Sequence, residues 1–123
     1  MVPFESPREY LFNLYATNTS QAKRIWRQDI KENWNYECAY CGSKENLTID
    51  HIIPRSKGGL DITKNIVCSC DSCNHSKGHT PWKEWYSSQE FFDMERYKKI
   101  KEWIKPDPLI NLFSYKPRKN NLT

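Results

Sequence analysis

The decisive stretch spans residues 38–78 and has the sequence CAYCGSKENLTIDHIIPRSKGGLDITKNIVCSCDSCNHSKG. It contains two Cys-x2-Cys pairs, and the 28 residues between the pairs are enough for a β-hairpin. Two such turns bring four thiolates together in a tetrahedral zinc site that leaves no open position for chemistry. We therefore predict one structural zinc ion, bound by Cys38, Cys41, Cys70 and Cys73.

Cys68 is the remaining cysteine, and its spacing to Cys70 is too short for a Cys-x2-Cys turn. We expect it to be a small buried residue of a strand, with its side chain directed away from the metal. Residues 1–8 contain no apolar leader, and the chain has no run of about 18 apolar residues that would span a membrane. These features predict a soluble cytoplasmic protein whose cysteines bind metal rather than form disulfides.

The composition predicts a single domain with a small core. A chain of 123 residues is one domain by length, and a core of that size gains from a bound metal. The net charge is +4, which only weakly favours a polyanionic partner. We divide residues 1–123 into N-terminal helices (1–36), a zinc-clamped ββα core (37–79), C-terminal helices (80–105) and a basic tail (106–123).

The central stretch resembles the HNH endonuclease family, in the branch whose ββα-metal core is flanked by a four-cysteine zinc site. The flanking segments resemble small stand-alone HNH proteins of cyanobacteria and their phages. The resemblance implies an α+β fold in which N- and C-terminal helices pack against the ββα-metal core. It rests on Asp50-His51 before Ile-Ile-Pro, Gly58-Gly59, Asn65 before an apolar run, and Cys73-Asn74 followed by Lys77.

The resemblance also implies roles for individual residues. His51 corresponds to the general base, and Asp50 and Asn74 correspond to the ligands of one catalytic Mg2+ or Mn2+ ion. Asn65 corresponds to the residue that ties the loop between the strands through side-chain to backbone hydrogen bonds. Because Asn74 occupies the third position of the motif, the pattern here is H-N-N. His75 is the alternative ligand, but it is rotated by about 100° around the helix.

The function implied is a metal-dependent endonuclease that nicks or cuts DNA with low sequence specificity. Its partner would be duplex DNA, with a phage or host DNA-processing protein as a possible second partner. Arg55, Lys57 and Lys77 can hold phosphate, although solvated surface cations are an equally open interpretation. Two alternatives remain open: a non-catalytic, zinc-stabilised DNA-binding module and a phage-type DNA-packaging accessory factor.

Local patterns predict the elements around this site. A helix over 6–16 would begin at Ser6-Pro7 and bury Tyr10, Leu11, Leu14 and Tyr15. A helix over 20–34 has one apolar stripe that includes Trp26 and Ile30. We expect strands over 37–40, 47–53 and 66–68, a loop over 54–63, and helices over 71–77, from 80 onward and over 93–104, the last with Met94, Tyr97, Ile100 and Ile104 on one face.

Overall fold

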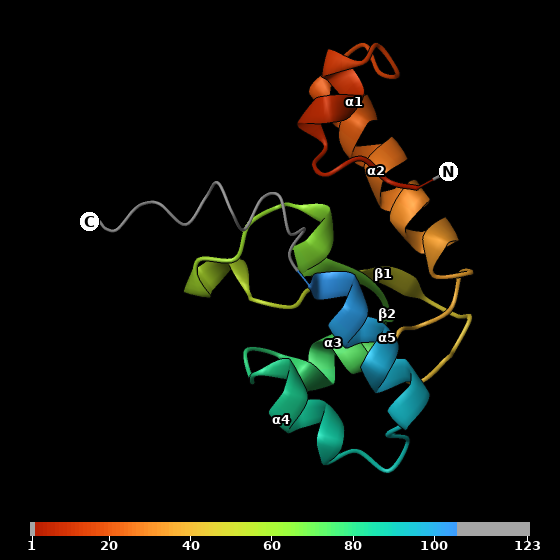
Figure 1. Ribbon diagram of the computed structural model, residues 1–123, viewed down its shortest axis with the longest axis vertical. Coiled ribbons are helices and arrows are strands. Elements are labelled where there is room, and N and C mark those ends of the chain that lie inside the picture. The colour runs from red at the N-terminus through yellow and green to blue at the C-terminus, as the bar shows by residue number, and fades with distance from the viewer. Residues whose placement is uncertain (1, 106–123) are drawn as a thin grey trace.

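A computed structural model describes residues 2–105, and helices pack around a two-stranded antiparallel sheet at its centre. Helices α1 and α2 lie at one end of the molecule and α4 lies at the other, with the sheet between them (Figure 1). The elements in chain order are α1 (Arg8–Phe12), α2 (Thr19–Asn33), β1 (Leu47–His51), the 3-10 turns η1 (Arg55–Lys57) and η2 (Thr63–Asn65), β2 (Ile66–Cys70), α3 (Asp71–Lys77), α4 (Trp82–Ser87) and α5 (Met94–Ile104).

Strands β1 and β2 form the hairpin that the motif spacing predicts. Their register places Asp50 opposite Val67 and His51 opposite Ile66. Strand β2 is buried along its whole length, and its β-branched residues suit a strand that is covered by other elements. Helices α2 and α3 both contact both strands. The α+β fold and its ββα unit, formed by β1, β2 and α3, are therefore confirmed.

The loop between the strands is held by Asn65. Its Oδ1 accepts a hydrogen bond from the Ile53 amide at 2.9 Å, and its Nδ2 donates to the carbonyls of Ile53 at 3.1 Å and Leu60 at 3.0 Å. Gly59 lies against this ring of bonds, because a Cβ there would be 1.7 Å from the Ile53 carbonyl oxygen. The hydrogen bonds expected of Asn65 are thus present in the structure.

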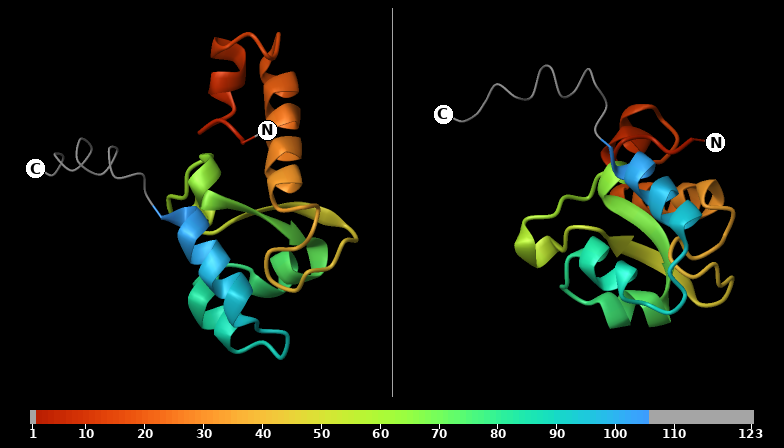
Figure 2. Two further views of the ribbon diagram at one scale, coloured as in Figure 1. Left: turned by 45° about the vertical axis from the view of Figure 1, so that its right-hand side comes forward. Right: turned by 60° about the horizontal axis from the view of Figure 1, so that its bottom comes forward.

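Thr63 joins segments that are far apart in the sequence. Its hydroxyl donates to the carbonyl of Phe4 and accepts a hydrogen bond of 2.8 Å from the indole nitrogen of Trp26 in α2. The indole of Trp103 in α5 donates to the carbonyls of Thr63 at 3.1 Å and Ile66 at 2.7 Å. The loop before β2 is therefore bonded to both flanking helices, α2 (orange in Figure 2) and α5 (cyan to blue).

The aromatic residues of α4 pack against the segment between the first cysteine pair. Tyr86 donates from its hydroxyl to the Tyr40 carbonyl at 2.7 Å, and the rings of Tyr40 and Trp85 meet edge to face at 5.0 Å. Tyr40 and Tyr86 are fully buried, and Trp82 and Trp85 nearly so. These aromatic side chains therefore belong to the core.

The predicted helix over 6–16 is wrong in its extent. Helix α1 ends at Phe12, because Leu14 adopts a left-handed conformation (φ +62°) and the Tyr10 carbonyl accepts from the amide of Tyr15 at 2.8 Å. Leu14 is 90% exposed and Tyr15 is also exposed, so only Tyr10 of the expected set is fully buried. The residue before the helix is Pro7, and its side chain makes no capping hydrogen bond.

The strand predicted over 37–40 is absent from the structure. The chain turns tightly there, with the Cys38 amide bonded to the Ser43 carbonyl at 2.8 Å and the Gly42 amide bonded to the Cys38 carbonyl at 2.9 Å. A Cys-x2-Cys turn therefore replaces the expected strand. The first strand ends at His51 rather than at residue 53, and the second extends to Cys70 rather than to residue 68.

Helix α2 confirms the predicted apolar stripe, since Ala22, Trp26 and Ile30 are buried. Helix α5 begins one residue after Asp93, which caps it by accepting a hydrogen bond from the Glu95 amide. Met94 is exposed, which corrects the expectation that it faces the core.

The predicted basic tail at 106–123 lies outside the described residues, and the domain boundaries stay predictions. Among the helices of residues 2–105, none has the length and apolar character needed to cross a membrane.

We predict that Gly59→Ala destabilises the protein more than Gly58→Ala does. A side chain at Gly59 would overlap the Ile53 carbonyl, whereas Gly58 has open space around it and carries only the cost of its positive φ of +90°. The expected loss of unfolding free energy is roughly 3 kcal/mol for Gly59→Ala and roughly 1 kcal/mol for Gly58→Ala. Thermal unfolding measures both, and equal melting temperatures for the two variants would contradict this account.

Candidate active site and cysteine cluster

A cleft of about 890 Å³ opens where β1 ends against α3 and η1. It brings together three of the residues for which the resemblance predicts a role in catalysis: Asp50, His51 and Asn74. Adjacent residues of a strand normally point to opposite faces of the sheet. Asp50 and His51 both reach this cleft because β1 ends at His51. The cleft is lined by Ile49, Asp50, His51, Pro54, Arg55, Ser56, Asp71, Asn74, His75, Gly78 and His79.

Asp50 lies at the base of the cleft and is only 4% exposed. Its Oδ2 accepts a hydrogen bond of 2.8 Å from the Tyr40 hydroxyl, and its Oδ1 lies 3.2 Å from the Nζ of Lys77. Burial raises the pKa of the Asp50 carboxyl above its usual value, and the charge of Lys77 and the Tyr40 hydroxyl oppose that rise. A carboxylate accepts about four hydrogen bonds or metal contacts, so these two partners leave room for a cation.

The ring of His51 lines the same cleft, and Asp61 in the loop between the strands bonds to it. Its Nε2 lies 2.8 Å from Oδ1 of Asp61, and the two side chains are 22% and 35% exposed. The hydrogen bond from His51 holds the pKa of Asp61 below its usual value, and the charges of Arg55 and Lys23 act in the same direction. Asp61 is therefore a carboxylate at neutral pH.

Asn74 projects from α3 towards β1. Its Nδ2 donates to the Ile49 carbonyl at 3.4 Å, and its Oδ1 has no hydrogen-bond partner among residues 2–105. His75 is exposed, whereas Asn74 is half-buried against the strand that carries Asp50. A carboxylate and an amide oxygen are hard donors that suit Mg2+ or Mn2+, so the residues present fit such an ion.

Lys77 does not occupy the surface position that phosphate contact requires. It is 1% exposed, and its Nζ donates to the His51 carbonyl at 3.3 Å in addition to pairing with Asp50. The physical reason is the burial of Asp50, whose negative charge needs a nearby cation. Arg55 and Lys57 are exposed on η1 as expected, and the Nζ of Lys57 donates to the His79 carbonyl at 2.9 Å.

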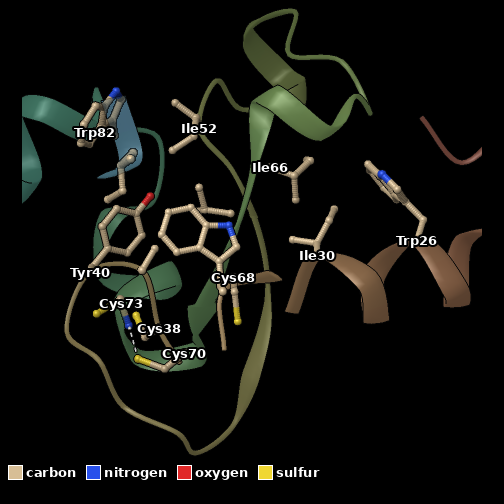
Figure 3. Close-up of a cluster of buried hydrophobic side chains, with 14 of the residues drawn as sticks. Trp26, Ile30, Cys38, Tyr40, Ile52, Ile66, Cys68, Cys70, Cys73 and Trp82 are labelled. Atoms are coloured by element: carbon tan, nitrogen blue, oxygen red, sulfur yellow. Dashed lines mark hydrogen bonds between the residues drawn. The ribbon is translucent and has the colours of Figure 1, made fainter. Parts of the chain in front are cut away.

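The four cysteines of the two pairs form one cluster. Their sulfur atoms all lie within 4.8 Å of one another, and the sulfurs of Cys41 and Cys70 are 3.7 Å apart. Four sulfurs placed about 2.3 Å from a tetrahedral zinc would be about 3.8 Å apart. The cluster can therefore hold a metal ion. Cys68 is buried in β2 but does not belong to the cluster, as expected (Figure 3).

The thiol groups of the cluster influence one another strongly. A hydrogen bond with Cys73 lowers the pKa of Cys38 to about 4, and the same bond raises the pKa of Cys73. Burial raises the pKa of Cys41. The protein alone therefore favours the thiolate of Cys38 and disfavours that of Cys73. A divalent cation removes this conflict, because it favours the deprotonated form of every ligand.

Two residues that complete the site were not anticipated from the sequence. The sequence patterns predict Tyr40 only as the last residue of a strand over 37–40, and Asp61 only as a residue of the loop over 54–63. Both lie within the central stretch, but no periodic pattern marks a residue in a turn or loop. A signal for Asp61 was its position shortly before Asn65, in the loop that Asn65 was expected to tie.

Comparison with known proteins relates this region to one family. Residues 38–85 match the family model described as HNH endonuclease. The matched range contains both cysteine pairs and all of β1, β2 and α3. The expected resemblance to an HNH endonuclease is therefore confirmed. The finer likeness to proteins of cyanobacteria and their phages stays a prediction.

Three similar proteins come from bacteria, and two of them are much longer. The CRISPR-associated endonuclease Cas9 of Corynebacterium diphtheriae is 33% identical over 87 residues, which cover 65% of this chain and 8% of that protein. Cas9 of Actinomyces naeslundii is 35% identical over 65 residues, which cover 50% of this chain and 6% of that protein. YoqL, an SPbeta prophage-derived protein of Bacillus subtilis whose name assigns it provisionally to the HNH endonucleases, is 36% identical over 95 residues, covering 63% of this chain and 39% of YoqL. The chain thus spans less than half the length of each.

We predict that Lys77→Met destabilises the fold by roughly 3–5 kcal/mol, since it leaves the buried Asp50 carboxylate without its cation. The double variant Asp50→Asn/Lys77→Met should recover much of that loss. Lys83→Met is the control, because Lys83 is exposed on α4 and a surface change should stay within about 0.5 kcal/mol. Urea unfolding followed by tryptophan fluorescence measures all three. Wild-type stability of Lys77→Met would show that Asp50 is neutral in the folded protein.

Proposed function

We propose that this chain, whose residues 38–85 match the model of the HNH endonuclease family, hydrolyses phosphodiester bonds of duplex DNA with a catalytic divalent cation. The observation that carries the proposal is the single cleft lined by Asp50, His51 and Asn74. It joins an acidic ligand, an imidazole base and an amide oxygen, which are the groups that such a hydrolysis needs.

Asp50 and Asn74 would hold one Mg2+ or Mn2+ ion through a carboxylate oxygen and the unpartnered Oδ1 of the amide. When bound, the ion polarises the scissile phosphate and stabilises charge on the departing 3'-oxygen. The ammonium group of Lys77 would favour the ionised form of Asp50, because it opposes the effect of burial on the carboxyl group. The buried ion pair thus keeps a negatively charged ligand at the base of the cleft.

His51 would accept the proton of the attacking water. Its Nε2 is engaged by Asp61, and its ring borders the cleft, so the other nitrogen is available to water beside a bound phosphate. Arg55 and Lys57 on η1 would hold flanking phosphates. Contacts of this kind recognise the DNA backbone rather than the bases, and we therefore propose low sequence specificity.

The four-cysteine cluster would hold one structural zinc ion. Its ligands are all thiolates, which leaves no open position for substrate. Cys38 and Cys41 precede β1, and Cys70 and Cys73 lie where β2 meets α3, the helix that carries Asn74. The ion would thereby hold the two metal-binding segments of the catalytic cleft in one arrangement.

For the zinc site, we predict about one zinc ion per chain in the purified protein and its loss in Cys38→Ser, accompanied by unfolding. Structural zinc contributes on the order of 10 kcal/mol to the folding of small sites. Cys68→Ser is the matched control and should keep its zinc, because Cys68 lies outside the cluster. Elemental analysis and circular dichroism measure both properties. A folded wild-type protein without zinc would remove the ion from this proposal.

For the cleft, we predict that the wild-type chain nicks or linearises a supercoiled plasmid with Mg2+ or Mn2+ and not with EDTA. His51→Ala should lower the rate by roughly 10² to 10⁴ while divalent-metal binding is kept, since it removes only proton transfer. Asn74→Ala should instead raise the metal concentration required, and excess Mn2+ should partly restore its activity.

His75→Ala is the control for the assignment on α3, because its side chain is exposed one position after Asn74. It should cleave at close to the wild-type rate, and Asn74→His should remain active. Loss of cleavage in His75→Ala with full activity in Asn74→Ala would move the ligand by one residue. A wild-type chain that binds DNA without cutting it under any of these conditions would favour the non-catalytic DNA-binding alternative.

A further inference from the structure

The loop of the hairpin contains an acidic residue, Asp61, that contacts His51, the proposed general base, directly. Oδ1 of Asp61 lies 2.8 Å from Nε2 of His51, a distance typical of a strong hydrogen bond between a charged and a neutral group. The ring of His51 is 22% exposed and Asp61 35% exposed, so the pair is partly shielded from water. Among residues 2–105, the other ring nitrogen of His51, Nδ1, has no hydrogen-bond partner.

Asp61 is held in place by the same bonds that close the loop. The carbonyl of Leu60, its neighbour, accepts from Nδ2 of Asn65 at 3.0 Å. On the other side, the Thr63 amide donates to the Glu5 carbonyl at 2.8 Å. The backbone is therefore anchored one residue before Asp61 and two residues after it. A carboxylate on a freely moving surface loop would lack this restraint.

The bond has a consequence for the chemistry of the imidazole. A neutral imidazole carries one N–H, and a carboxylate can only accept, so Asp61 requires that the hydrogen reside on Nε2. The lone pair is then on Nδ1. Arg55 and Lys23 favour the ionised form of Asp61, which keeps it an acceptor.

We propose that Asp61 is a positioning residue that fixes His51 in the Nε2–H tautomer and presents Nδ1 to the attacking water. This inference rests on the proposed function, because it assigns a role within the same cleft. It also gives Asn65 an indirect role in catalysis. Asn65 fixes the loop that carries Asp61, and Asp61 orients the imidazole of His51.

The tautomer can be observed without any cleavage assay. The chain has three histidines, so two-bond ¹H–¹⁵N correlation spectra of the ¹⁵N-histidine-labelled full-length protein contain few signals. His75→Gln and His79→Gln variants identify the other two rings. In alkaline buffer, wild-type His51 should show the Nε2–H pattern. Asp61→Ala should show a mixture of tautomers, and Asp61→Glu should restore the wild-type pattern at least in part.

Cleavage under single-turnover conditions tests the catalytic consequence. Asp61→Ala should lower the maximal rate by roughly 10²-fold, the effect of a misplaced catalytic group, with the KM for DNA and the metal requirement unchanged. Asp61→Glu should recover much of the rate. Glu90→Gln is the control, because it makes the same change in net charge at an exposed residue outside the cleft.

The Nδ1–H tautomer in the wild type, an unchanged tautomer in Asp61→Ala, or wild-type cleavage by that variant would each overturn the proposal. If the wild-type chain cleaves no DNA but its tautomer depends on Asp61, the nuclease function fails and the contact between Asp61 and His51 stands. If cleavage occurs and is independent of Asp61, the nuclease function stands and the positioning role fails.

Discussion

The constraint on which the rest of the structure depends is the convergence of four cysteine sulfurs within 4.8 Å. Two of them come from a turn before β1 and two from the junction of β2 with α3, so their cluster closes the ββα unit at one end. The hairpin has only two strands, and such hairpins are marginally stable alone in water. A metal ion held by both cysteine turns would supply what the small sheet lacks. The aromatic residues of α4 then cover this closed end, with Tyr86 bonded to the Tyr40 carbonyl.

A second constraint is the burial of Asp50, because an isolated carboxylate at 4% exposure would be strongly unfavourable. Lys77 at the end of α3 and Tyr40 in the turn before β1 resolve this by offering a cation and a hydroxyl. Replacing such a pair by apolar residues often increases stability. The presence of this pair in the cleft is therefore better explained by a need for negative charge where a catalytic cation would bind.

Features set by local spacing could be predicted from the sequence, whereas those set by pairing across the fold could not. The Cys-x2-Cys spacings, the apolar stripe of α2 and the Gly58-Gly59 turn each follow from local geometry, and the structure contains them. The burial of Lys77 depends on Asp50, which lies far away in the chain. The residues next to Lys77 in the sequence therefore do not distinguish it from a surface lysine. Leu14 appeared to extend an apolar helix face, but its left-handed backbone ends the helix and exposes it.

The loop between the strands shows how the fold and the site are coupled. Asn65 bonds to Ile53 and Leu60 and so closes the loop over the backbone of Gly59, where any side chain would collide with the Ile53 carbonyl. Next along the chain, Thr63 bonds this loop to α2 and to α5. Hydrogen bonds to both flanking helices therefore hold the loop in place. Helices α2 and α5 thus restrain, through Thr63, the loop that also carries Asp61, the hydrogen-bond partner of His51.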